Sequence, residues 1–358
     1  MARQRLQQQP DDSGATLWLG KSLYAQRKTA EAGEVLRKLA TSGSGNPSES
    51  RWAVQACGLL SAIARQGDKE SSSQPLEWLD RAVRDYPESA EAWIQRARFH
   101  RIIQRDPQKC RADLDAASGL LIEDPSVHVQ YAEEWFQLGE WERARQSLDA
   151  VTDVPSATIA DYDIDSEAWI HIRSAIGCKI ALKEKRWDEG IAIASRALEG
   201  LSGARRASIL PFAIELHLYA GRFEEAKKLV ADLRDIAESQ TDDSIREQSG
   251  LMAAMVAEKD GQFADAIRYL DDAFTTSEIP PQALRILGRA CERTGQTRRS
   301  VAALETLTER DPSNFEAVMT LAKHYRNLDW VKTRKYAMRA ERLVPEDLEA
   351  RTLRWEAQ

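Results

Sequence analysis

The feature that most constrains this chain is a unit of about 34 residues that recurs along it in phase. The clearest copy is residues 281–312, in which two stretches of helical periodicity flank Gly295. Small or apolar residues recur three or four positions apart in both stretches, which is the spacing of one helix face: Leu284, Leu287, Gly288, Cys291, Ser300, Leu304 and Leu307. The unit therefore predicts an antiparallel helical hairpin that must stack on neighbours to bury its second face.

The order of residues in this unit resembles the tetratricopeptide repeat (TPR) family. That family's pattern is a bulky residue, Leu-Gly, an aromatic residue, a glycine turn, two alanines around an aromatic or leucine, and a terminal proline. We count nine imperfect copies; Leu19-Gly20 opens the pattern in the first, and Trp135, Gly139 and Ala144 carry it in the fourth. The resemblance implies an all-α fold, an α-solenoid in which helical hairpins form a right-handed superhelix. It also implies that the chain serves in protein–protein interaction.

The repeats divide the chain into two arrays. A partial repeat and four repeats fill residues 1–152, an acidic linker or hinge covers 153–165, and five repeats fill 166–345. Residues 346–358 predict one more helix. It is either a polar cap, which solenoids require at their ends, or the first helix of a truncated repeat. The half-repeat at 2–10 favours truncation, which would make the chain a piece of a longer protein.

Several positions in the copies carry specific structural expectations. A glycine at the end of the first helix, as at Gly139, predicts a left-handed cap where the chain reverses. Ala226 and Ala266 are expected where the two helices of a hairpin nearly touch. In the third copy the second helix is expected to run over residues 107–122, with an extra residue or two.

Composition and charge exclude some classes of partner. The chain of 358 residues has a net charge of −7, so it lacks the global basic field that attracts nucleic acid or anionic lipid. No apolar run approaches the length of a membrane span, and the first residues lack the apolar core of a secretion signal. We therefore expect no nucleic-acid partner, no membrane partner and a cytoplasmic location.

The sequence offers little catalytic chemistry. The four cysteines lie far apart at packing positions, and the five histidines form no metal-binding pair. Asp161, Asp163 and Asp165 imitate the start of a calcium loop, but Ser166 and Ile172 replace the glycine and glutamate that such a loop requires. We expect a chain that is not an enzyme and has no metal and no cofactor.

The TPR resemblance implies that the first helix of each hairpin lines a concave face, where a partner would bind. The residues expected on that face are Arg98, Phe136, Met255, Arg285, Arg289, Arg293, Lys323 and Arg326. The last two copies contribute five cations to it, and the planar guanidinium of arginine suits carboxylates. The hypothesis is a groove for an acidic or C-terminal peptide; the alternative is a solvated face whose arginines pair with nearby acids.

Three functions fit these expectations. The first is a scaffold or adaptor that binds a peptide or partner helix in its groove. The second is a regulatory or substrate-recruiting segment of a larger multidomain protein, which could be an enzyme. The third and least favoured is an RNA-binding helical array, because residues 139–145 also resemble the half-TPR repeats of RNA-processing scaffolds, although such readers carry basic grooves.

Overall fold

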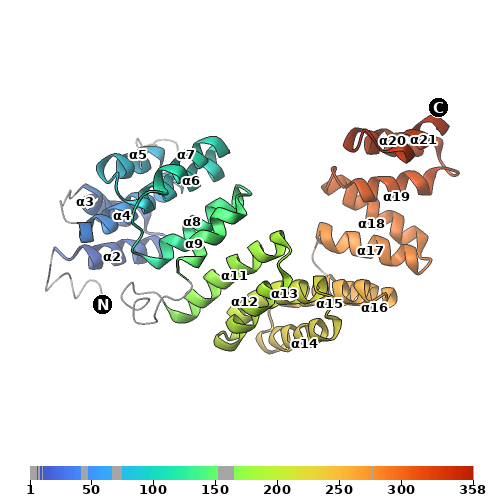
Figure 1. Cartoon of the computed structure of the whole chain (residues 1–358), viewed down its shortest axis with the longest axis horizontal. Coiled ribbons are helices and arrows are strands. Elements are labelled where there is room, and N and C mark those ends of the chain that lie inside the picture. The colour runs from blue at the N-terminus through green and yellow to red at the C-terminus, as the bar shows by residue number, and fades with distance from the viewer. Residues whose placement is uncertain are drawn as a thin grey trace. The chain divides into compact units, whose positions relative to one another are not determined.

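The described part of the chain is all-α and contains no strand. The computed structural model describes residues 6, 9, 11–41, 47–66, 75–151, 165–275 and 278–357. By its internal contacts the chain divides into two units, a first unit of residues 1–184 and a second unit of 185–358. The predicted α-solenoid class of helical hairpins is confirmed in both (Figure 1). The predicted linker lies outside the described residues except for Asp165, which accepts a hydrogen bond from the Ala168 amide at 3.1 Å.

In the first unit, consecutive helices pack in pairs. The pairs are α2 (Ser13–Ala25) with α3 (Thr29–Thr41), α4 (Pro47–Gln66) with α5 (Pro75–Asp85), α6 (Ala90–Phe99) with α7 (Pro107–Ala117), and α8 (Pro125–Gln137) with α9 (Trp141–Asp149). Helix α11 (Ser166–Glu184) packs against α8 and α9.

The second unit repeats the same arrangement. It begins with α12 (Trp187–Gly200), and its pairs are α13 (Gly203–Tyr219) with α14 (Phe223–Gln240), α15 (Asp243–Lys259) with α16 (Phe263–Ala273), α17 (Pro281–Arg293) with α18 (Thr297–Arg310), and α19 (Phe315–Tyr325) with α20 (Trp330–Leu343). A last helix, α21 (Leu348–Glu356), packs against α20 and α19.

The glycine turns adopt the predicted left-handed conformation. Gly139, Gly221, Gly261 and Gly295 have φ between +74° and +79°. At Gly295 the reversal is closed by a 2.8 Å hydrogen bond from the Gln296 amide to the Cys291 carbonyl. This geometry lets the second helix fold back along the first.

Paired helices approach most closely where the repeat pattern has a small residue. A Cβ added to Gly288 would lie 2.6 Å from a methyl carbon of Leu304, and one added to Gly20 would lie 2.5 Å from Leu36. The Ser300 hydroxyl donates to the Gly288 carbonyl at 2.8 Å across the same contact. The small residues of the repeat pattern therefore mark the places where the two helices of a hairpin are in contact.

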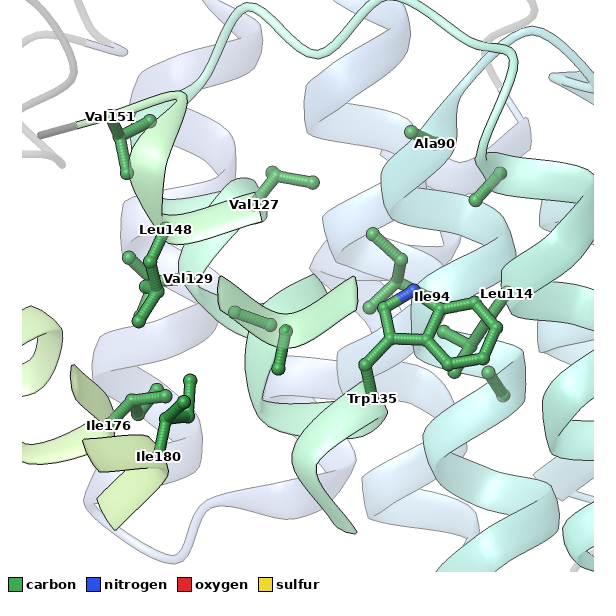
Figure 2. Packing of buried hydrophobic residues seen from close by; sticks show 14 of the residues in the cluster. Ala90, Ile94, Leu114, Val127, Val129, Trp135, Leu148, Val151, Ile176 and Ile180 are labelled. Carbon is green, nitrogen blue, oxygen red and sulfur yellow. The ribbon is translucent and has the colours of Figure 1, made fainter. Parts of the chain in front are cut away.

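Apolar side chains from successive hairpins merge into a continuous core. In the first unit Trp135 of α8 is buried beside Ile94 of α6 and Leu114 of α7 (Figure 2). Ile176 and Ile180 of α11 join the same cluster. Each hairpin thus covers the apolar flank of the next, as the stacking of repeats requires.

The third hairpin departs from the expected boundaries. Helix α7 ends at Ala117, so the prediction that it reaches residue 122 was wrong. A π-helical turn, η1 (His100–Gln104), extends α6, and it ends at Arg105 with φ +54°. Such a turn holds one more residue than an α-helical turn. His100 is buried there, with Nδ1 2.6 Å from the Gln104 side-chain oxygen.

Helix α21 carries a tryptophan where the preceding first helices carry a small residue. Aligned from its first residue, Trp355 occupies the position of Gly288 in α17 and Ala322 in α19. Its side chain is 64% exposed, and the Arg354 guanidinium lies 5.8 Å from the centre of its ring system.

Candidate functional site

Helices α17 and α19 carry the five cations predicted for the binding face, here called the cationic row: Arg285, Arg289, Arg293, Lys323 and Arg326. The three arginines of α17 are spaced four residues apart, so they share one side of that helix. Leu284, Leu287 and Cys291 occupy the opposite, buried side. The face formed by α15, α17, α19 and α21, the first helices of this part of the chain, is called the first-helix face below.

Glu258 of α15 lies beneath the cationic row. Its side chain is only 3% exposed, and it accepts a hydrogen bond from Arg289 Nη1 at 3.2 Å. Arg285 lies 3.9 Å from the same carboxylate. The other end of the Arg289 guanidinium bonds Glu316 of α19, and this bond together with the charge of Glu258 raises the pKa of Arg289. Arg289 therefore joins three successive hairpins through two carboxylates.

The two cations of α19 continue the pattern with α21. Lys323 Nζ lies 2.8 Å from Glu349, and Arg326 pairs with Glu356. All four of these side chains are substantially exposed. Exposed pairs contribute little stability and exchange readily for other partners.

Arg293 differs from the rest of the row. Its side chain is exposed and, within the described part of the chain, forms no ion pair with a carboxylate. Its guanidinium lies 5.3 Å from the centre of the Phe263 ring. Arg293 and Arg289 line a pocket of about 450 Å³, together with Glu258, Lys259, Phe263 and Glu292. The pocket thus contains one arginine held by carboxylates and one that is not.

Arg98 and Phe136 belong to the first unit, whereas the cationic row belongs to the second. Arg98 Nε donates to Glu134 at 2.7 Å and Nη2 donates to Glu133 at 3.2 Å. Glu134 is fully buried and also accepts two hydrogen bonds from Arg101, at 2.7 and 3.0 Å. Phe136 is half-buried against the core cluster of the first unit. This group is a brace between α6 and α8.

Met255 is a core residue rather than a surface one. Its side chain is buried, and the Gln282 amide lies 3.1 Å from its sulfur. Its side chain offers little surface area to a partner. The prediction that Met255 lies on the binding face is therefore not supported by its burial.

A second hollow lies on the first helices of the first unit. It measures about 440 Å³ and is lined by residues of α2, α4, α6 and α8, among them Lys21, Gln55, Glu91, Gln95 and Arg98. Gln95 donates to Glu91 at 3.1 Å. Burial, aided by the charge of Asp124, raises the pKa of Glu91 to about 7, against the hydrogen bonds from Gln55 and Gln95.

Sequence reasoning did not single out Glu134 or Glu316. A signal exists for Glu134, because it pairs with Arg98 across 36 residues, which is about one repeat. A search for opposite charges separated by one repeat would have found it. Glu316 lies only 27 residues from Arg289, so the same search would have missed it.

The described residues hold no cluster of His, Cys, Asp and Glu able to bind a metal ion. Nor does any helix among them have an apolar stretch of the length and composition needed to cross a bilayer.

Comparison with known protein families agrees with the repeat pattern of the sequence in two segments. The sequence profile of the tetratricopeptide repeat matches residues 2–47 and 251–297. Both segments cover helical pairs, α2 with α3 and α15 with α16. These two segments are tetratricopeptide repeats. No match to the sequence was found among curated proteins.

Solved structures share the fold of this chain at low identity. A chain of the APC/C hetero-tetramer Cut9–Hcn1 is 11% identical, with a TM-score of 0.50 over 96% of this chain and 76% of that one. A tetratricopeptide repeat protein from Parabacteroides merdae is 12% identical, with a TM-score of 0.46 over 78% and 98%. Yeast Tom70 is 15% identical, with a TM-score of 0.43 over 83% and 58%. TPR folds generally mediate protein–protein interaction.

Proposed function

We propose that this chain is a non-catalytic scaffold whose first-helix face in the second unit binds an acidic peptide or partner helix. Arg293 carries the proposal. It is an exposed arginine without a carboxylate partner among the described residues, and it shares a pocket with Arg289. Burial of an arginine–carboxylate pair in a hollow gives a stronger interaction than the same pair in open solvent.

The pairs already present support a preference for carboxylates. Arg289 holds Glu258 on one side and Glu316 on the other, and Glu316 is 57% exposed. A partner's carboxylate could replace Glu316 without uncovering the buried Glu258. Arg293 would bind a second carboxylate of the partner, and Phe263 would supply an apolar contact.

The test is peptide-array binding by the full chain with graded acidic sequences. Arg289→Glu combined with Arg293→Glu should lower the affinity for acidic peptides by about a hundredfold, because two charge-assisted contacts become repulsive. The matched control is Arg298→Glu with Arg334→Glu, which makes the same charge change at exposed positions of α18 and α20. Equal binding by the two double variants would refute the site.

A further inference from the structure

The second helices of the second unit carry their own regular ion pairs. Lys332 of α20 lies 3.1 Å from Glu305 of α18, and Arg299 of α18 pairs with Asp271 of α16. In both pairs the cation stands one residue before the small residue of its helix, Thr333 or Ser300. The acid stands five residues after the small residue of the preceding second helix, Ser300 or Ala266.

This regular pairing fails between α14 and α16. The equivalent cation position, one before Ala266, is Asp265, and the equivalent acid position, five after Ala226, is Ala231. Asp265 instead pairs with Arg268 of its own helix at 2.8 Å. No side chain at these two positions therefore bridges the two helices.

A pocket of about 310 Å³ lies where the pair is missing. Its floor comes from α15, and its sides come from α14 and α16. The floor is apolar and consists of Ala253, Val256 and Ala257, while Ala231, Arg234 and Tyr269 stand at the sides. This volume is at the lower end of ligand pockets, which suits one side chain and its neighbours better than a large ligand.

Arg234 gives the pocket its charge. It is exposed, and within the described ranges no carboxylate pairs with it; its guanidinium lies 5.4 Å from the centre of the Tyr269 ring. The other cation at the pocket, Lys227, is neutralised by Asp260 at 2.9 Å and Glu224 at 3.0 Å. An apolar floor beside one uncompensated arginine complements an apolar group that carries a negative charge.

We propose that this pocket binds a peptide segment that places one apolar side chain on the Ala–Val floor and a carboxylate against Arg234. The carboxylate belongs to an acidic side chain or to the C-terminus of the peptide. This pocket shares no lining residue with the pocket at the cationic row, so the two sites are distinct and this one does not depend on the function proposed there.

The experiment uses the full chain and short fluorescent peptides with a central Leu or Phe, read by fluorescence anisotropy. In the first arm, the residue after the apolar one is Glu in one peptide and Gln in the other. In the second arm, the peptide ends at the apolar residue, either as a free carboxylic acid or as an amide. The charged member of at least one arm should bind about tenfold more tightly than its neutral counterpart. The arm that shows the difference identifies the source of the carboxylate.

Variants localise the binding. Arg234→Ala should weaken the charged peptide about tenfold and leave the neutral one unchanged. Ala231→Glu should abolish binding of both, because the new side chain fills the pocket and offers Arg234 an internal carboxylate. Lys228→Ala, an exposed cation of α14 that does not line the pocket, is the matched control.

Two results would overturn the site. One is no binding by any peptide up to about 1 mM, the weakest affinity of interest. The other is unchanged affinity in both pocket variants, with circular dichroism confirming that each is folded. Arg289→Glu with Arg293→Glu should leave this binding intact, so loss in that variant alone would assign the peptides to the first-helix face.

Discussion

Single residues in the cores of this protein have chemistry set by burial. The thiols of Cys57, Cys110, Cys178 and Cys291 are all buried, and none of them forms a disulfide. Burial raises the pKa of the first three to about 12 and raises that of Cys291 as well. The sequence-based expectation that they serve in packing is confirmed by their positions.

The thiolate is the reactive form of cysteine, so these residues should be inert in the folded protein. At a pH of about 8 we expect native protein to leave a chromogenic disulfide reagent unreacted, and denatured protein to consume four equivalents, one per cysteine. Rapid consumption of even one equivalent by the native protein would show that a core is open.

Glu91 predicts a pH dependence of stability. Its folded-state pKa of about 7 exceeds the unfolded value, so the folded state holds the proton more tightly. Proton binding by the Glu91 carboxyl therefore stabilises the folded state in full below a pH of about 4.3. This contribution to the free energy of unfolding is lost as the pH rises toward 7. Glu91→Gln should therefore raise the free energy of unfolding at a pH of about 8, by roughly 1–2 kcal/mol after allowance for partial exposure.

Urea unfolding of wild type and Glu91→Gln at a series of pH values checks this. The matched control is Glu88→Gln, an exposed carboxylate just before α6. The free energies of unfolding of wild type and Glu91→Gln should diverge as the pH rises from about 4.5 to 7. A constant difference over this range would contradict the raised pKa of Glu91.

At the residue scale the sequence predicted on which helix a charged residue lies better than it predicted which residue pairs with it. Arg289 and Arg98 were expected on first helices, and that is where they lie. Their carboxylates come from neighbouring hairpins, and helical periodicity says nothing about how one hairpin is offset against the next. The same applies to the buried Met255, whose sulfur is contacted by Gln282 of the following first helix.

At the scale of the helices, small residues fix how closely a pair can pack. Ala226 and Ala266 are fully buried in α14 and α16. Ala266→Leu should overpack its contact and lower the free energy of unfolding by about 1–3 kcal/mol. Ala264→Leu, on the exposed side of the same helix, should change it by less than about 0.5 kcal/mol. Equal unfolding midpoints in urea for the two variants would show that the repeat register is misassigned.

The brace between α6 and α8 gives a second test among the helices. Glu134→Ala leaves Arg98 and Arg101 without their shared buried carboxylate and should cost about 3–5 kcal/mol. Glu133→Ala removes a half-exposed partner of Arg98 and should cost under about 1 kcal/mol. Thermal unfolding distinguishes them, and a mild effect at Glu134 would mean that water reaches that carboxylate.

Helix ends were harder to predict than helix pairing. The glycine turns were confirmed because φ near +75° strongly favours glycine, which makes the signal local. The π-helical turn at His100–Gln104 left no such signal. In this turn the buried His100 contacts the exposed Gln104 side chain and Asp113 of α7, whose carboxylate lies 3.4 Å from the His100 ring, and helical periodicity does not reveal these contacts.

At the scale of the whole molecule, repetition explains both what the sequence reveals and what it conceals. The hairpins follow one imperfect pattern, and the class of fold follows from its periodicity. Both proposed sites lie at departures from the pattern, namely Arg293, which has no carboxylate partner among the described residues, and the missing ion pair between α14 and α16. These are visible only when neighbouring hairpins are placed side by side.

The most direct test of the proposed scaffold is hydrogen exchange with and without an acidic peptide whose binding requires Arg293. Amides of α17 and α19 should exchange more slowly in the complex, while those of α18 and α20 should be unchanged. Protection confined to α18 and α20, or saturating binding with no protection in α17, would contradict recognition by the first-helix face.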